Sequence, residues 1–530
     1  MNKLLNFLQK NKLFFIFLAI YILVRLIFIN INYTEWGDTF RMIRASDFLS
    51  HFSWPWDEKR WPIYSLLLVP GLYLKAPILW GRLLAIVISS FTFTFLYLFY
   101  LNFISKNKSY AVLAVTLTAL TSTFAYWSIR VMADPFFTLI VVAYLYLFLK
   151  LFSNKNLPVL QKLLMSAILV IATMTRLEGV FLVTATGLYL LLNKRMIDII
   201  YIAISQLLIY VPWTIYAKFL YSGPVQNDYL TEASKFVFNI DRVIYFFTYT
   251  TFILTIPISA YFIFLAIKKL KIQNSKLYLV PSLFILQEIL LGVIWTPSLP
   301  RIYMPIIPFF AVLLIYGLEN FEIKKSKLNF ITISVILTFL FAIFQYKERL
   351  YFFGVSKLPF ALVVLSSLFV LILTLIYSRY AKKLLISYFI FISVLISFTT
   401  IYNQKDIYKT VKQATEYLED KSGKVAYADE TGVTEWYLRN NYYYLDSKKS
   451  YSYDEMKEVF KQENVKYILQ TTEFNRGSKF DDIIQNKDYT LVKLYKQPIR
   501  DIFDQFLDNI GLASDKDYTV FVSEVYKINE

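Results

Sequence analysis

The chain has 530 residues, of which 57% are hydrophobic and 19% aromatic, and its mean hydropathy is +0.49. Soluble domains are about 45–50% apolar even when glycine is counted as apolar, so this composition excludes an ordinary soluble protein. The formal net charge of +17 does not indicate a nucleic-acid partner, because basic residues in membrane proteins fix the topology from the cytoplasmic side.

Long apolar runs recur along the first four hundred residues, and each is long enough to cross a bilayer. INYTEW follows the first run instead of a small-residue cleavage site, so this run is not expected to be a cleaved signal. We predict about thirteen membrane-spanning helices, near residues 13–31, 82–104, 110–128, 134–152, 160–174, 177–192, 197–219, 243–267, 277–295, 302–319, 328–345, 358–378 and 384–402.

Lysine and arginine cluster in alternate loops, which contain almost no acids. Cytoplasmic loops carry such an excess of basic residues, so we predict a cytoplasmic N-terminus and an external segment after residue 403. The basic clusters are Lys3, Lys10 and Lys12; Lys106 and Lys108; Lys155 and Lys162; Lys194 and Arg195; Lys268, Lys269, Lys271 and Lys276; Lys324, Lys325 and Lys327; and Arg379, Lys382 and Lys383.

The last segment differs in character, with more charge and shorter periodicity. Strands are predicted at residues 424–430, 466–472, 489–496 and 518–528, and helices at 453–465 and 499–510. Such an alternation indicates a small α/β domain. The expected architecture is a polytopic α-helical membrane domain over residues 1–402, with a first external loop at about 32–81, and a small extracytoplasmic α/β domain over residues 403–530.

Ionisable residues gather at the external ends of the predicted spans. Such groups are costly at membrane depth unless they are paired or functional, which makes them site candidates. The candidates are Asp38, Arg41, Glu58 and Lys59 in the first loop, Arg130 and Asp134 in YWSIRVMADPFF, Arg176 and Glu178 in MTRLEGV, and Arg301 with Tyr303 in WTPSLPRIYMPIIP.

Each candidate also has a structural interpretation. Arg130 with Asp134, and Arg176 with Glu178, are suited to local ion pairs, and Arg301 is suited to reach the interface. The tryptophans of SWPWDEKRWP at 53–62 are typical interfacial anchors. His51, the single histidine, is expected at the surface. The absence of cysteine and of a second histidine excludes thiolate and multi-histidine metal sites. The sequence specifies no cofactor and leaves a divalent-metal requirement open.

In their order, side and spacing these residues resemble the GT-C class of glycosyltransferases that use polyprenyl-phosphate sugars, within it the group of protein O-mannosyltransferases and aminoarabinose transferases. The resemblance covers roughly residues 10–400. Its motifs are Asp38 early in the first loop, Glu58-Lys59-Arg60-Trp61-Pro62, Ala133-Asp134-Pro135, Thr175-Arg176-Leu177-Glu178-Gly179, and Arg301-Ile302-Tyr303 before Pro305 and Pro308.

Two departures from the group's pattern stand out. Arg60-Trp61 replaces the first proline of its Glu-Lys-Pro-Pro-Leu stretch, and Ile302 separates Arg301 from Tyr303. The Trp-Trp-Asp-Tyr-Gly motif of oligosaccharyltransferases is absent from the sequence after residue 403, which argues against block transfer of an oligosaccharide to asparagine.

The resemblance implies transfer of a sugar from a polyprenyl-phosphate donor to a hydroxyl of a lipid, glycan or protein acceptor, with inversion at the anomeric carbon. Such a reaction needs a carboxylate to take the acceptor's proton and cations for the leaving phosphate. The expected general base is Asp38, supported by Asp134 and Glu58. The expected phosphate-binding residues are Lys59, Arg301, Tyr303 and Arg176, and the expected substrate-binding residues are Arg130, Glu178 and Arg41. Two alternatives remain: a transporter or flippase for an anionic lipid or lipid-linked sugar, and an inactive scaffold.

Overall fold

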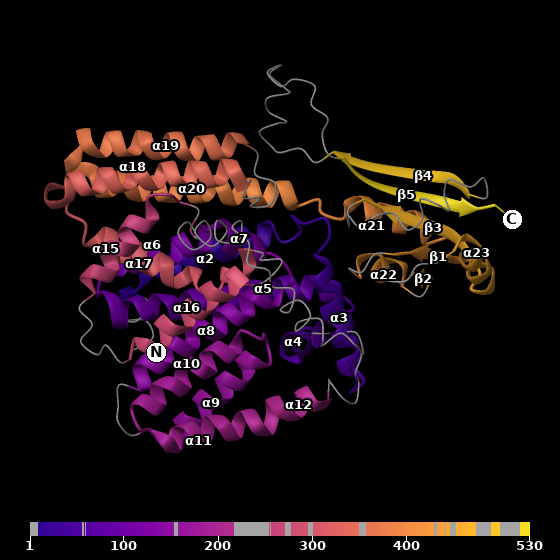
Figure 1. The fold of residues 1–530 in the computed structure, drawn as a ribbon, viewed down its shortest axis with the longest axis horizontal. Coiled ribbons are helices and arrows are strands. Elements are labelled where there is room, and N and C mark those ends of the chain that lie inside the picture. The colour runs from indigo at the N-terminus through magenta and orange to yellow at the C-terminus, as the bar shows by residue number, and fades with distance from the viewer. Residues whose placement is uncertain are drawn as a thin grey trace. The chain divides into compact units, whose positions relative to one another are not determined.

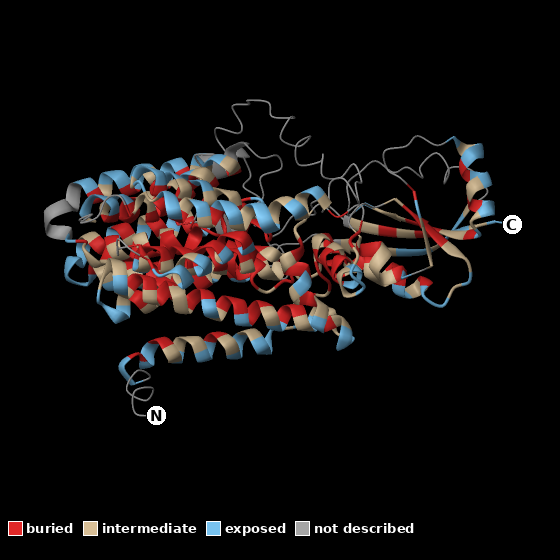
Figure 2. Ribbon diagram, turned by 90° about the horizontal axis from the view of Figure 1, so that it is seen from below, coloured by how far each residue is buried: buried red, intermediate tan, exposed pale blue. Residues whose placement is uncertain are grey.

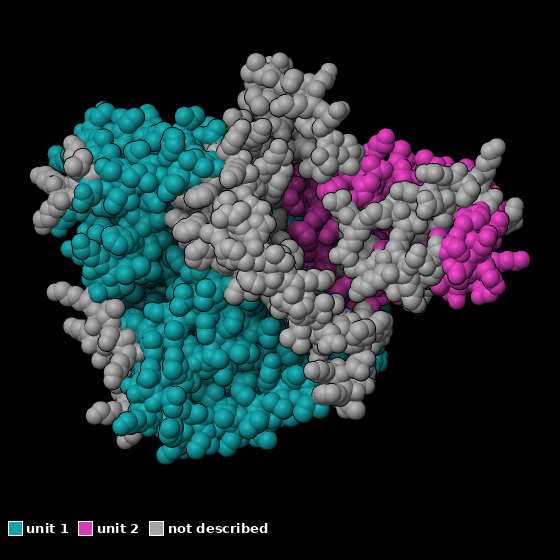
Figure 3. All heavy atoms as spheres, viewed as in Figure 1, with its two compact units in different colours: residues 1–29, 45–401 teal, residues 30–44, 402–530 magenta. Residues whose placement is uncertain are grey.

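The computed structural model describes most of the chain. The described residues are 9–55, 58, 60–152, 157–216, 254, 256–270, 277–294, 300–348, 357–428, 432–439, 441–445, 452–472, 489–498 and 520–529. They form two compact units: Met1–Ile29 with Ala45–Ile401, and Asn30–Arg44 with Tyr402–Glu530 (Figure 3). The start of the predicted first external loop, up to Arg44, is thus part of the same unit as the C-terminal segment.

The first unit is helical (Figure 1). Its helices are α2 (Lys12–Ile27), α4 (Pro62–Tyr73), α5 (Pro77–Phe99), α6 (Lys108–Leu120), α7 (Ser122–Trp127), α8 (Ala133–Leu151), α9 (Val159–Thr173), α10 (Gly179–Leu192), α11 (Met196–Ser205), α12 (Val211–Ile215), α15 (Ser259–Lys269), α16 (Leu279–Ile294), α17 (Ile307–Glu319), α18 (Ile323–Glu348), α19 (Lys357–Ile376) and α20 (Ala381–Gln404). The π-helices η1 (Tyr100–Ile104) and η2 (Gln206–Tyr210) follow α5 and α11, and the 3-10 turns η4 (Pro300–Tyr303) and η5 (Ser378–Tyr380) precede α17 and α20.

Four helical stretches among the described residues are long and apolar enough to cross a membrane: Pro77–Ile104, Ala133–Leu151, Met196–Ile215 and a window within Ser378–Leu418. Shorter apolar helices lie in other predicted spans. The predicted span 110–128 is divided at Thr121, where an extended backbone separates α6 from α7.

Buried residues concentrate in the interior of the helical unit, and exposed residues line its outward helix faces (Figure 2). Many of the exposed residues are large and apolar. Helix α8 is buried over most of its surface, with one half-exposed stripe at Phe136, Leu139, Ala143 and Leu147, and packs against α5, α7 and α9. A helix that is apolar all round is typical of the interior of a bundle. The N-terminal end of α8 is therefore held among its neighbours, which matters because Asp134 lies there.

The second unit contains a five-stranded mixed sheet with the order β2-β1-β3-β5-β4. Strands β2, β1 and β3 are parallel, and β3, β5 and β4 are antiparallel. The elements are α21 (Lys409–Leu418), β1 (Lys424–Tyr427), α22 (Val433–Leu438), β2 (Tyr442–Tyr444), α23 (Tyr453–Gln462), β3 (Val465–Thr471), β4 (Tyr489–Pro498) and β5 (Val520–Ile528).

Each segment predicted as a strand overlaps an observed strand, and the helix predicted at 453–465 corresponds to α23. The helix predicted at 499–510 lies outside the described residues. Alternate residues along the strands point to opposite faces of the sheet and pack into two apolar clusters. Ala426 and Ile468 pack with Phe460 of α23, whereas Val425 and Leu469 pack with Leu418 of α21. The sheet is thus covered by a helix on each face.

Candidate functional site

Asp134 lies in the first turn of α8, in the Ala133-Asp134-Pro135 motif. Proline is favoured in the first turn because its missing N–H has no intrahelical acceptor there. The positive end of the helix dipole also stabilises a carboxylate at this position. The side chain is 2% exposed, so its charge requires a partner inside the protein.

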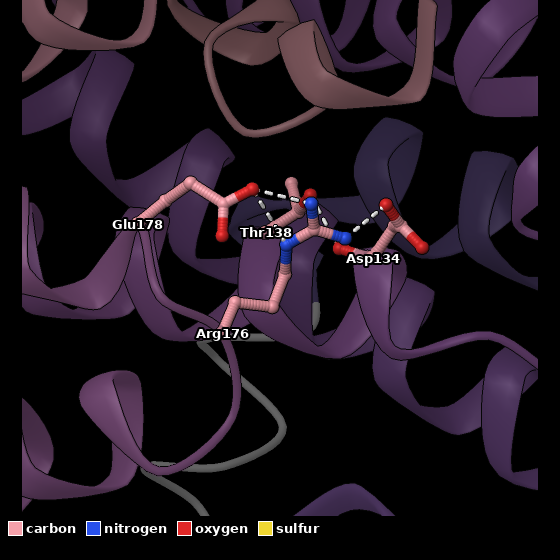
Figure 4. Close-up of polar contacts among 4 residues, drawn as sticks. All are labelled: Asp134, Thr138, Arg176 and Glu178. Carbon is pink, nitrogen blue, oxygen red and sulfur yellow. Dashed lines mark hydrogen bonds and ion pairs between the residues drawn. The ribbon is translucent and has the colours of Figure 1, made fainter. Parts of the chain in front are cut away.

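The partner comes from the tight turn between α9 and α10. A Cβ atom on Gly179 would lie 2.3 Å from the backbone carbon of Ala172, so only glycine allows this close approach. The turn places Arg176 toward Asp134. The Arg176 guanidinium bonds to Asp134 with one nitrogen and to Glu178 with two others, the Nε–Oε1 distance being 3.1 Å (Figure 4).

The three side chains form an Asp134–Arg176–Glu178 network in which the two carboxylates are buried and Arg176 is half-buried. Burial by itself would raise the pKa of Glu178, but the guanidinium of Arg176 outweighs it and holds this pKa below its ordinary value. Burial would lower the pKa of Arg176, and the two carboxylates raise it instead. Arg176 and Glu178 are therefore both charged at neutral pH. The predicted local pair Arg176–Glu178 is present, and the partner of Asp134 is Arg176.

The first predicted loop reaches this network through residues 58–64. The amide of Ile63 donates to the carbonyl of Met174 at 3.2 Å, two residues before Arg176. The ring of Tyr64 lies 6.3 Å from that of Phe136, two residues after Asp134. The stretch Glu58-Lys59-Arg60-Trp61-Pro62 thus ends beside both the turn and the start of α8.

Glu58 is buried, and its Oε1 accepts from the backbone and the side chain of Arg60 at 2.8 and 2.9 Å. Its predicted neighbour Lys59 lies outside the described residues. Trp54 and Trp61 contact aromatic rings of the segment at η2 and α12, Trp213 at 5.1 Å and Tyr210 at 5.2 Å. The tryptophans therefore pack against a second helical segment.

The turn η4 carries the two residues predicted from WTPSLPRIYMPIIP. Arg301 lies over the ring of Trp127 at 5.3 Å, close enough to α10 to interact electrostatically with Glu178. Tyr303 is buried, and its hydroxyl lies against Gly292 of α16. Arg130 is fully buried beside the ring of Tyr126 at 4.7 Å.

Glu288 was not predicted from the sequence. It is a fully buried acid within the apolar helix α16, and its carboxyl group interacts electrostatically with Glu178 and Arg176. Helices α10 and α16 pack together, and Gln287 bonds to Thr184 across them at 3.1 Å. The sequence did contain a signal that could have identified Glu288, because an acid within an otherwise apolar span is unusual.

Asp38 and Arg41 belong to the second unit. Asp38 lies in the first turn of α3 (Gly37–Ser50) and is half-buried. The same end of α3 packs through Phe40 against Trp436 and Tyr437, with ring distances of 5.8 and 5.5 Å. These contacts fix the backbone that carries Asp38. His51, which follows α3, is exposed as predicted.

Within the described ranges, no group of three or more histidine, cysteine, aspartate or glutamate residues is placed to hold a metal ion.

Gly292→Ala should destabilise the protein, because the added Cβ would lie 2.1 Å from the hydroxyl of Tyr303. Overpacking of this kind costs about 1–3 kcal/mol. The control is Gly187→Ala in α10, where a Cβ meets nothing within 4 Å and the higher helix propensity of alanine adds about 0.5–1 kcal/mol. Thermal unfolding in detergent should lower the Tm for Gly292→Ala only; equal Tm values would contradict this packing of Tyr303.

No protein-family model and no curated protein matches the sequence. Solved structures do match the fold. ArnT from Cupriavidus metallidurans bound to undecaprenyl phosphate aligns with a TM-score of 0.58 and 13% identity, over 96% of this chain and 97% of ArnT. The chain has a GT-C fold. The apo crystal structure of ArnT gives the same values.

A second GT-C structure agrees. The oligosaccharyltransferase AglB from Archaeoglobus fulgidus, in complex with an inhibitory peptide and a dolichol-phosphate, aligns with a TM-score of 0.51 and 12% identity, over 88% of this chain and 70% of AglB. The resemblance inferred from short motifs is thus confirmed at the level of the GT-C fold. The long apolar helices of the chain are those of a membrane protein.

Proposed function

We propose that this GT-C protein transfers a sugar from a polyprenyl-phosphate donor to a hydroxyl acceptor at the extracytoplasmic face of the membrane. The observation that carries the proposal is the alignment of nearly the whole chain with a structure that holds undecaprenyl phosphate. Charged residues of four separate segments support it, because those of α8, the turn before α10, α16 and η4 approach one another around the Asp134–Arg176–Glu178 network.

The roles follow from charge and position. Arg301 and Lys59 are the donor-phosphate ligands in this proposal, with Tyr303 as a hydroxyl donor, because charge-assisted hydrogen bonds are roughly twice as strong as neutral ones. The guanidinium of Arg176 already donates hydrogen bonds to the carboxylates of Asp134 and Glu178. Its contribution to phosphate binding is therefore to keep Asp134 and Glu178 neutralised beside an anionic lipid.

The remaining roles concern the acceptor and the sugar. Asp38 is proposed as the base that takes the acceptor's proton. Glu58 holds Arg60 and thereby orders the backbone on both sides of Lys59. Arg130 and Arg41 are proposed to bind substrate. The acceptor is a lipid, a glycan or a protein hydroxyl.

Binding of undecaprenyl phosphate tests the proposal at its first step. The purified protein should bind undecaprenyl phosphate at least tenfold more tightly than undecaprenol, which has the same tail without the phosphate. Arg301→Ala should remove most of this difference, whereas Arg439→Ala, at an exposed arginine of the second unit, should leave it intact. Equal affinity of the wild-type protein for both lipids would contradict the proposal.

The membrane topology is part of the same proposal: about thirteen spans, a cytoplasmic N-terminus and an external C-terminal unit. The absence of native cysteine permits a direct check with two exposed lysines. In intact cells a cysteine introduced as Lys461→Cys should react with an impermeant thiol reagent, and one introduced as Lys106→Cys should react only after permeabilisation. The reverse pattern would overturn the orientation.

A further inference from the structure

Glu288 has unused hydrogen-bonding capacity at a buried position. The residue lies in α16 with 0% of its surface exposed. Neither carboxyl oxygen has a hydrogen-bond partner in the part of the chain that the structure describes. Leaving a buried polar group without a hydrogen-bond partner destabilises the protein, so a ligand that supplies the partner is favoured.

The position of Glu288 connects it to the candidate site. Its carboxyl group is within electrostatic range of Arg176 and Glu178. One turn further along α16, on the same helix face, the hydroxyl group of Tyr303 packs against Gly292. Glu288 therefore lies on the face of α16 that meets both the network and the predicted phosphate-binding tyrosine.

The chemistry of the surroundings restricts what Glu288 can bind. The guanidinium of Arg176 already donates to Asp134 and Glu178, so it does not satisfy Glu288. Both carboxyl oxygens remain available for hydrogen bonds. A sugar suits them because its adjacent hydroxyl groups both donate and accept hydrogen bonds.

We propose that Glu288 binds hydroxyl groups of the donor sugar and thereby contributes to sugar specificity. This inference rests on the proposed function, which supplies a sugar-bearing lipid to the site. It assigns recognition of the sugar to α16, whereas the phosphate is recognised by η4 and the first loop.

The test compares two lipids on the same variants. The probes are undecaprenyl phosphate and whichever of its glucose, galactose and mannose esters the wild-type protein binds most tightly. Glu288→Leu should raise the Kd of the sugar-bearing lipid about tenfold, which corresponds to the loss of one hydrogen bond. The Kd of undecaprenyl phosphate should change less than twofold.

Two further variants complete the design. Glu288→Gln keeps the size and some hydrogen bonding, so it should fold even if Glu288→Leu does not, and it should raise the Kd several-fold for the sugar-bearing lipid alone. Gln287→Leu is the matched control, because Gln287 is the neighbouring polar residue of α16 and bonds to Thr184 instead. It should leave both affinities unchanged.

The outcomes separate this inference from the proposed function. An equal change for both lipids, or no change for either, would overturn the role of Glu288. Failure of the wild-type protein to bind undecaprenyl phosphate would overturn the proposed function itself. Wild-type affinity that is the same with and without a sugar would leave the lipid site standing and overturn the sugar contact.

Discussion

Asp38→Asn should lower the rate of sugar transfer by about two to four orders of magnitude, the usual contribution of a positioned general base. A hydroxyl acceptor is a weak nucleophile until its proton is taken, and the amide of asparagine cannot take it. The substitution preserves size, and the contacts of Phe40 with Trp436 and Tyr437 hold this end of α3. Folding and donor binding should therefore be unchanged, as measured by Tm and by binding of undecaprenyl phosphate.

The matched control is Asp47→Asn, at an exposed aspartate of the same helix, which should transfer at the wild-type rate. Asp134→Asn provides a second comparison. If Asp134→Asn were inactive while Asp38→Asn turned over normally, the base would be Asp134. If both variants stayed active, the assignment of general-base catalysis to these carboxylates would fail.

Arg176→Met should lower the free energy of unfolding by about 3–5 kcal/mol, because removing one partner leaves buried charge uncompensated. The change would remove the cation that pairs with Asp134, which is 2% exposed, and with Glu178, which is 8% exposed. Thermal unfolding in detergent should show a large loss of Tm. Donor binding should fall as well, since two uncompensated carboxylates would then repel the lipid phosphate.

The control is Arg439→Met, which removes an ion pair to Glu419 whose side chains are 80% and 57% exposed. Exposed pairs contribute about 0–1 kcal/mol, so this Tm should barely change. Equal effects of the two substitutions would show that the buried network is not a structural requirement.

The same network predicts acid sensitivity. The pKa of Glu178 in the folded protein lies below its ordinary value of 4.5. Its contribution to stability is therefore complete above that ordinary value and is lost as the pH falls through the lower, folded-state pKa. Arg176→Met should weaken this part of the pH dependence, because the guanidinium is what lowers the pKa.

The apolar helices and the rim residues could be predicted because run length and charge are local properties of the sequence. The pairing of Asp134 with Arg176 could not, because these residues are separated by 42 positions and meet only through the packing of α8 with α9. Glu288 was missed for a different reason. It has no motif around it, and its burial beside Glu178 depends on how α10 and α16 meet.

Helices inside predicted loops were missed as well. The mixture of charge, tryptophan and proline in residues 32–81 concealed α3 and α4, although Pro62 stands at a favourable helix start. Helix α21 carried a readable signal in Val411, Ala414, Thr415 and Leu418, which are buried and spaced for one helix face. The three-residue strand β2 was too short to show alternation.

Turnover of a labelled donor tests the central claim most directly. Purified protein in lipid nanodiscs, and in parallel in sealed proteoliposomes, would be incubated with undecaprenyl-phosphate esters of several sugars, each labelled in the sugar, together with membrane-derived acceptors. The account predicts that free undecaprenyl phosphate appears from at least one donor and that Asp38→Asn prevents transfer of its sugar. Binding of the donors without any release of lipid phosphate, accompanied by their movement across sealed vesicles, would contradict the account and identify a transporter instead.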